Sequence, residues 1–142
     1  VDRHIPWTKT VAEKKSNFHG EMVDLIPFLR ENRENMVLKP IGLFGGKDVV
    51  VGKDASEDEW NATIEKALRE KYVVQEYIPI PTIELPICTD DGIRFERKKI
   101  NMNFYAFNGK YSGGLARVSD KNVINVCAGG GIVPIITVSE KQ

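Results

Sequence analysis

The sequence predicts an α+β fold in which antiparallel sheet is the larger part, and three observations support this prediction. Two dipeptides that accept the positive φ angles of tight hairpin turns, Asp91-Gly92 and Asn108-Gly109, divide the second half of the chain. Between them, residues 100–107 alternate between two sets of side chains, as in a strand with two different faces. In the first half, Ser56 and Glu59 form a capping box, which is typical of a helix N-terminus.

Helices and strands can be assigned from caps, turns and apolar spacing. A first helix is expected from Asp24, a good N-cap, to about residue 34, because Leu25, Phe28 and Leu29 recur at helical spacing. A second helix follows the capping box, with four apolar side chains on one face: Trp60, Ile64, Ala67 and Leu68. Strands are expected at residues 36–39, 49–51, 72–78, 111–118 and 123–126, whereas residues 1–20 are expected to be irregular.

Length and composition predict one ordinary globular domain over residues 1–142. The chain is 42% hydrophobic and 28% charged, as is usual for such domains. Its 20 basic residues balance its 20 acidic residues, so no overall field attracts nucleic acid or an anionic membrane. Any bound anion must therefore be held by a few local cations and backbone N–H groups.

The two cysteines, Cys88 and Cys127, lie far apart in apolar sequence and belong to no metal-ligand pattern. Each is expected to be a buried free thiol, although one disulfide between them stays open as an alternative. A free thiol favours a reducing compartment, so we expect a cytoplasmic protein. No apolar run is long enough to span a membrane. The start at Val1 without a methionine fits a processed protein or a fragment of a longer one.

Several common chemistries find no support in the sequence. The only histidines, His4 and His19, lie near the start, and neither a nucleophile-elbow pattern nor a set of zinc ligands is present. Lys47 follows Gly46, but Asp48 replaces the Ser or Thr of a Walker A loop, and the Rossmann glycine fingerprint is absent.

A strand lysine followed by a glycine-rich turn is the first feature suited to an anion. Lys39 closes an apolar strand, so its ammonium group projects from a fixed position. Gly42, Gly45 and Gly46 can bring bare backbone N–H groups against phosphate oxygens, and Lys47 adds a second cation. The alternative is a strand-end lysine beside an ordinary hairpin.

Polar side chains in two later segments are further candidates. Gln75 and Glu76 interrupt an apolar strand, where Glu76 can accept hydrogen bonds from ribose hydroxyls or an adenine amino group; an exposed strand glutamate is the alternative. Arg117 lies among apolar neighbours, so a phosphate or carboxylate ligand is expected to pair with it, with an internal ion pair as the alternative. Asn125 follows. Three successive glycines then fit close approach to an anion or a mobile cover over a site: Gly129, Gly130 and Gly131.

Together, these segments resemble the ATP-grasp superfamily. Residues 37–52 match its phosphate-gripping hairpin, residues 74–78 its adenine-contacting hinge strand, and residues 117–131 the arginine–asparagine–glycine segment of glutathione-synthetase-like ligases. Pro6-Trp7-Thr8 and the run from Gly114 to the triple glycine resemble the circularly permuted branch, which includes glutathionylspermidine-synthase-like proteins. In that branch the acidic Mg²⁺ ligands lie upstream of the gripping lysine, where this chain has no acidic pair in a strand. We therefore expect the C-terminal part of a longer protein.

The resemblance implies an ATP-grasp-type antiparallel sheet with a few flanking helices, and a ligase that joins a carboxylate to a peptide-like or polyamine-like amine through an acyl phosphate. Lys39 would hold the α- and β-phosphates of ATP under the glycine loop, and Gln75 and Glu76 would hold adenosine. Arg117 would stabilise the transferring phosphoryl group, while Asn125 and the triple glycine would contact the phosphorylated carboxylate. Mg²⁺ would be held by residues outside this chain, in the remainder of its own polypeptide. The isolated chain is therefore expected to be inactive.

Two other interpretations stay open. The chain can be a non-catalytic module that binds a nucleotide or another protein through an ATP-grasp-like fold. It can also be a structural β-rich domain whose glycines only form turns.

Overall fold

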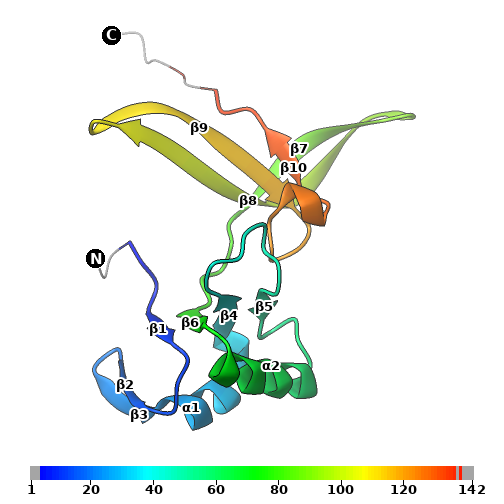
Figure 1. Ribbon diagram of the computed structural model, residues 1–142. Helices are drawn as coiled ribbons and strands as arrows, with labels where there is room; N and C mark the ends of the chain where they lie inside the picture. Colours follow the sequence, from blue (N-terminus) through cyan, green and yellow to red (C-terminus); the bar gives the residue numbers. More distant parts are fainter. Residues whose placement is uncertain (1–3, 137, 139–142) are drawn as a thin grey trace. The chain divides into compact units, whose positions relative to one another are not determined.

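The computed structural model describes residues 4–136 and 138, and the chain divides into two compact units, Val1–Pro79 (unit 1) and Ile80–Gln142 (unit 2) (Figure 1). The structure combines α-helices with antiparallel sheets, so the predicted α+β fold is confirmed. The assignment of residues 1–142 to a single ATP-grasp subdomain stays a prediction, since two compact units can belong to one domain.

Unit 1 is built on a four-stranded antiparallel sheet with the strand order β1-β6-β4-β5. These strands are β1 (Thr8–Thr10), β6 (Tyr72–Glu76), β4 (Met36–Pro40) and β5 (Val50–Val51). The other elements are the hairpin of β2 (Lys15–Phe18) and β3 (Glu21–Asp24), the helices α1 (Leu25–Glu31) and α2 (Glu57–Arg69), and the short 3-10 helix η1 (Arg33–Asn35). The predicted hairpin around the glycine-rich turn is confirmed as the β4–β5 pair.

The core of unit 1 lies between one face of this sheet and the two helices (Figure 1). Strand alternation supplies four of its side chains: Met36, Leu38, Tyr72 and Val74. The helices add Leu25, Leu29, Trp60, Ile64 and Ala67. The same alternation places Val37, Lys39 and Gln75 on the opposite face of the sheet. The packing of the core thus decides which strand residues are free for other tasks.

Ser56 caps α2 as the capping box predicts, because its hydroxyl oxygen accepts a hydrogen bond from the backbone N–H of Glu59 at 3.2 Å. We expect Ser56→Ala to lower the free energy of unfolding of unit 1 by about 1 kcal/mol. Urea unfolding followed by tryptophan fluorescence measures this, because Trp60 on α2 is fully buried. Ser56→Asp keeps a capping oxygen and should keep most of the stability; an equal loss in both variants would contradict a capping role.

Unit 2 is a second four-stranded antiparallel sheet with the order β10-β9-β8-β7. Its strands are β7 (Thr82–Thr89), β8 (Gly92–Phe107), β9 (Lys110–Ser119) and β10 (Gly131–Val133), and the 3-10 helix η2 (Val126–Ala128) precedes β10. Asn108 and Gly109 form the predicted β8–β9 turn, with φ angles of 50° and 73°. The β7–β8 turn is centred one residue earlier than predicted, on Asp90 and Asp91, because Thr89 pairs with Gly92.

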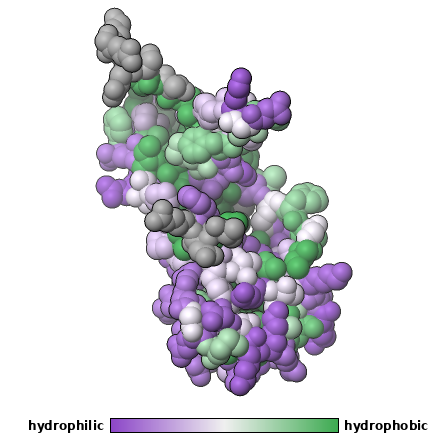
Figure 2. Space-filling model, turned by 90° about the vertical axis from the view of Figure 1, so that its left-hand side faces the viewer, coloured by the Kyte–Doolittle hydropathy of each residue, from purple (hydrophilic) through white to green (hydrophobic). Residues whose placement is uncertain are grey.

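The described residues of unit 2 contain no α-helix to cover the sheet, and large apolar side chains remain exposed. Phe95, Phe104 and Phe107 are 67%, 62% and 70% exposed. Figure 2 shows hydrophobic residues at the surface among the strands of this unit. Such faces are suited to contact with another polypeptide segment.

Three further predictions were wrong. Residues 1–20 are not irregular throughout, because β1 pairs with β6, and β2 pairs with β3 around His19 and Gly20. Residues 123–126 form no strand, since the side chain of Asn125 caps η2 instead and β10 takes the place beside β9. Cys88 and Cys127 are free as predicted, but they are exposed rather than buried, in a unit whose described residues include no α-helix to cover the sheet.

Candidate functional site

Lys39 lies near the end of β4, on the sheet face opposite the helices. Its side chain is partly buried, and its ammonium group donates a hydrogen bond to the amide oxygen of Gln75 on β6. Burial lowers the pKa of Lys39 below the usual lysine value of 10.5, because desolvation disfavours the charged form. Within residues 4–136 and 138, Lys39 forms no ion pair with a carboxylate. Its positive charge is therefore positioned but not neutralised.

The amide of Gln75 connects Lys39 to the edge strand. Gln75 Nε2 donates to Thr8 Oγ1 at 2.9 Å, and Thr8 Oγ1 donates to the carbonyl oxygen of Pro6 at 2.9 Å. The three side chains share one face, since Thr8 is the register partner of Gln75 on β1 and Val37 is its partner on β4. Two predicted site residues, Lys39 and Gln75, are thus in contact, although they were assigned to different parts of ATP, and Thr8 is a third member that sequence reasoning did not find.

The glycine-rich loop follows β4 directly, and residues 41–48 are all exposed. Gly42, Gly45 and Gly46 have φ angles of 88°, 72° and 74°, which explains the choice of glycine at each position. Lys47 lies in the same exposed loop. Its neighbour Asp48 ends the loop with φ 57°. The loop therefore offers backbone N–H groups and one lysine close in sequence to Lys39.

Asp48 ties the end of the glycine-rich loop to α2. Its carboxylate lies 3.0 Å from the ammonium group of Lys66, which also lies above the ring of Tyr72 at 5.8 Å from its centroid. The hydrogen bond to Asp48 raises the pKa of Lys66. The loop is thus held at its C-terminal end by an ion pair that the sequence pattern alone does not reveal.

The side chain of Glu76 points to the face of the sheet opposite to that of Lys39 and Gln75, because successive strand residues alternate between the two faces. Its carboxylate is 3.1 Å from His19 Nε2 in the β2–β3 turn. The two residues border a hollow of about 670 Å³ whose other walls include Trp7 and Ile78. The predicted contact of Glu76 with adenosine stays a prediction, and its side chain has a local partner in His19.

Arg117 lies in β9 between Asn101 of β8 and Ile132 of β10. Its Nε atom is buried and has no hydrogen-bond partner, and Arg117 forms no ion pair in the part of the chain that the structure describes. The alternative interpretation, an internal ion pair of Arg117, is therefore not observed among the described residues. A buried donor without a partner is costly, so Arg117 lacks the internal acceptor that a purely structural arginine would have.

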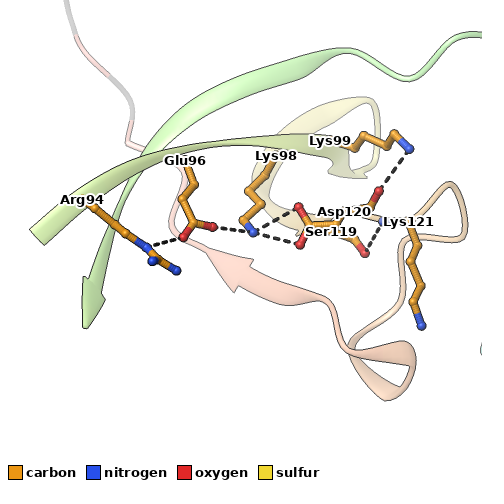
Figure 3. A network of polar contacts seen from close by, with 7 residues as sticks. All are labelled: Arg94, Glu96, Lys98, Lys99, Ser119, Asp120 and Lys121. Carbon is orange, nitrogen blue, oxygen red and sulfur yellow. Dashed lines mark hydrogen bonds and ion pairs between the residues drawn. The ribbon is translucent and has the colours of Figure 1, made fainter. Parts of the chain in front are cut away.

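Three other cations of this sheet, in contrast to Arg117, have acceptors within unit 2. Figure 3 shows a chain of contacts in which Arg94 lies 2.5 Å and Lys98 2.6 Å from the carboxylate of Glu96, and Lys98 also lies 2.9 Å from Asp120. Lys99 donates to the backbone oxygen of Asp120 at 3.1 Å. The contacts with Glu96 and Asp120 raise the pKa of Lys98, while Lys98 and Arg94 lower the pKa of Glu96. Arg94, Lys98 and Lys99 thus have acceptors within unit 2 and need no ligand.

Asn125 and the triple glycine form one compact turn next to β9. The side-chain oxygen of Asn125 accepts from Cys127 N at 3.2 Å, and its backbone oxygen accepts from Gly130 N at 2.9 Å. Gly129 has φ 91°, and a Cβ atom on Gly130 would lie 2.8 Å from the Asn125 oxygen. Gly131 opens β10 opposite Val118. The positive φ angle favours glycine at 129, and local packing requires glycine at 130. Contact of this segment with a substrate stays a prediction.

The candidate residues thus form two groups, each within its own unit. Unit 1 holds Lys39, Gln75 and the glycine-rich loop, and unit 2 holds Arg117 beside the Asn125 turn. Among the described residues, no three His, Cys, Asp or Glu side chains are grouped to hold a metal ion. None of the described helices combines the length and apolar character needed to cross a membrane. Comparison of the chain with protein-family models and with curated proteins finds no match.

Proposed function

We propose that this chain is the ATP-binding portion of a carboxylate–amine ligase of the ATP-grasp type, from the circularly permuted branch. In this proposal a carboxylate attacks the γ-phosphorus of ATP to give an acyl phosphate and ADP. A peptide-like or polyamine-like amine then displaces phosphate to form the amide. The enzyme works in the cytoplasm.

One observation carries the proposal: the ammonium group of Lys39 is partly buried, and its described side-chain partner is a neutral amide. Partly buried cations are commonly paired with carboxylates, which offset the cost of desolvation. An amide acceptor orients the ammonium group but leaves its charge to meet a phosphate. The neighbouring loop of positive-φ glycines supports the same interpretation, because its backbone can approach phosphate oxygens closely.

Each candidate residue has a role in the proposed reaction. Lys39 and the loop from Gly42 to Lys47 hold the α- and β-phosphates, and the strand at Gln75 and Glu76 holds adenosine. Arg117 stabilises charge on the transferring phosphoryl group, a role supported by its unpartnered Nε. Asn125 and the turn at residues 129–131 contact the phosphorylated carboxylate.

Phosphoryl transfer of this kind also uses Mg²⁺, which neutralises charge between the β- and γ-phosphates. The described residues contain no acidic cluster that fits this ion. We propose that the remainder of the polypeptide supplies the acidic ligands, so that the chain by itself binds nucleotide without turnover.

A second candidate function is a non-catalytic protein-interaction module with the same fold. The exposed apolar side chains of unit 2, including Phe95, Phe104 and Phe107, favour it. The two functions differ in whether a nucleotide binds and whether ADP is released.

Isothermal titration with a non-hydrolysable ATP analogue and Mg²⁺ tests the proposal, and an ADP-release assay with carboxylate and amine panels on the full-length protein follows it. We expect saturable binding to the chain and ADP release only when an amine acceptor is present. Binding without ADP release from any acceptor would favour a non-catalytic nucleotide-binding module, and the absence of nucleotide binding would contradict the ligase and favour the protein-interaction module.

A further inference from the structure

The segment Pro6-Trp7-Thr8 leads to Lys39 through a continuous line of hydrogen bonds. Thr8 Oγ1 donates to the Pro6 carbonyl oxygen at 2.9 Å and accepts from Gln75 Nε2 at 2.9 Å. Gln75 Oε1 in turn accepts from the ammonium group of Lys39. The three side chains come from three strands that are adjacent in the sheet, β1, β6 and β4.

The direction of each hydrogen bond in this line is fixed by chemistry. A carbonyl oxygen only accepts, so the single hydroxyl proton of Thr8 goes to Pro6 and its oxygen must accept from Gln75. Gln75 therefore turns its NH₂ group toward Thr8 and its oxygen toward Lys39. An ammonium group only donates, so the requirement of Lys39 agrees with this orientation. A flipped Gln75 amide would place two donors against each other at Lys39 and two acceptors against each other at Thr8.

We propose that Thr8 is a positioning residue that orients the Gln75 amide and thereby fixes the Lys39 ammonium group at one place on the sheet face. The expected effect of Thr8 on nucleotide binding rests on the proposed function, in which Lys39 contacts the phosphates. It gives a role to a segment that otherwise only resembles a family pattern.

The benefit of such a line of contacts is preorganisation without neutralisation. Lysine has a flexible four-carbon side chain, and ordering it during binding costs affinity. A carboxylate partner would order Lys39 but would also compete with phosphate for its charge. The Gln75 amide orders Lys39 without that competition, provided that the amide keeps its orientation.

Thr8→Val tests the inference, because it keeps the shape of the side chain but removes the hydroxyl group. Without the hydroxyl group, the amide of Gln75 loses the acceptor that fixes its orientation. The charged form of Lys39 then loses a fixed acceptor, so we expect the pKa of Lys39 to be lower than in the wild type. Titration of ¹³Cε-labelled lysine by NMR measures this pKa without a nucleotide. We also expect about fivefold weaker binding of a non-hydrolysable ATP analogue with Mg²⁺, as for the loss of one net hydrogen bond.

Three variants control this experiment. Thr10→Val changes the neighbouring threonine on the same face of β1, which is exposed and forms no side-chain hydrogen bond in the described residues, and should leave both readouts unchanged. Thr8→Ser restores the hydroxyl group and should restore both. In a Gln75→Leu background, Thr8→Val should cause no further change, because the connecting amide is already absent. If Thr8→Val does not fold, Thr8→Ala replaces it in the same comparisons.

A Lys39 titration that is the same in Thr8→Val and the wild type would overturn the inference. So would a shift of equal size in the Gln75→Leu background, since the effect would then not pass through the amide. Failure of the wild type to bind the nucleotide, with the Lys39 titration shifted as expected, would instead contradict the proposed function and leave the orienting role of Thr8 supported.

Discussion

Lys39→Met is expected to weaken the binding of ATP and of ADP by a similar factor, about tenfold to a hundredfold, as for the loss of a charge-assisted hydrogen bond. Both nucleotides are affected because the proposed contacts of Lys39 are with the α- and β-phosphates, which they share. Methionine keeps much of the length of the aliphatic side chain, so β4 should be preserved. Isothermal titration with each nucleotide provides the two affinities.

Lys9→Met is the matched control, since Lys9 lies in β1 of the same sheet but faces its other side, opposite Val74. Its nucleotide affinities should equal those of the wild type. Equal losses in both variants would show a general effect of surface charge and would contradict a specific role for Lys39.

Nucleotide affinity should depend on pH through the titration of Lys39, and Lys39→Met should abolish this part of the pH dependence. Burial lowers the pKa of Lys39 from 10.5, so its positive charge is lost earlier than in an exposed lysine as the pH rises. Nucleotide affinity should therefore decrease with rising pH already below 10.5. Stability has the opposite sign: between the folded and unfolded pKa values the unfolded chain binds more protons, so this group makes stability rise with pH. Affinity and stability thus change in opposite directions over the same range.

The parts of the fold that the sequence predicts are those with strong local signals. The capping box at Ser56 and Glu59 and the turn at Asn108-Gly109 depend on backbone geometry within a few residues. Both are found where they are expected. The glycine-rich hairpin is a signal of the same kind, because three of its glycines adopt positive φ angles.

Features that depend on pairing between distant strands are not visible in the sequence. The edge strand β1 has only three residues, too few for a recognisable period, and it forms by pairing with β6. Thr8 therefore could not be assigned to the same group as Lys39. The separation of Gln75 from Glu76 follows from the register of β6 with β4, which decides that Gln75 and Lys39 share a face.

The charges of the candidate site could be predicted only in part, for a similar reason. The expectation that Arg117 needs an acceptor follows from its apolar neighbours, and the unpartnered Nε atom supports it. The sequence could not tell, however, that Lys98 and Lys99 have an acceptor in Asp120 while Arg117 has no ion pair among the described residues, because those contacts connect β8 to the residue after β9.

Arg117→Met is expected to remove the preference for ATP over ADP while leaving the free energy of unfolding unchanged or higher. Arg117 is proposed to contact the γ-phosphoryl group, so ATP affinity should fall by about tenfold to a hundredfold and ADP affinity should stay the same. Stability should not fall, because the buried Nε has no partner to lose. Methionine has a similar length and no donor that needs an acceptor, and removing an unsatisfied buried group relieves about 1–3 kcal/mol at most.

Arg97→Met controls for charge on the same sheet, since Arg97 is exposed on β8 opposite Glu84 and should affect neither affinity nor preference. Loss of stability in Arg117→Met without a change in preference would indicate a structural arginine and contradict the proposed role. The tests of Lys39 and Arg117 are independent, because Lys39→Met should weaken the binding of both nucleotides and Arg117→Met should weaken the binding of ATP only. A nonspecific anion site would not distinguish the two variants in this way. Each variant removes one positive charge, so both would weaken nucleotide binding to a similar extent.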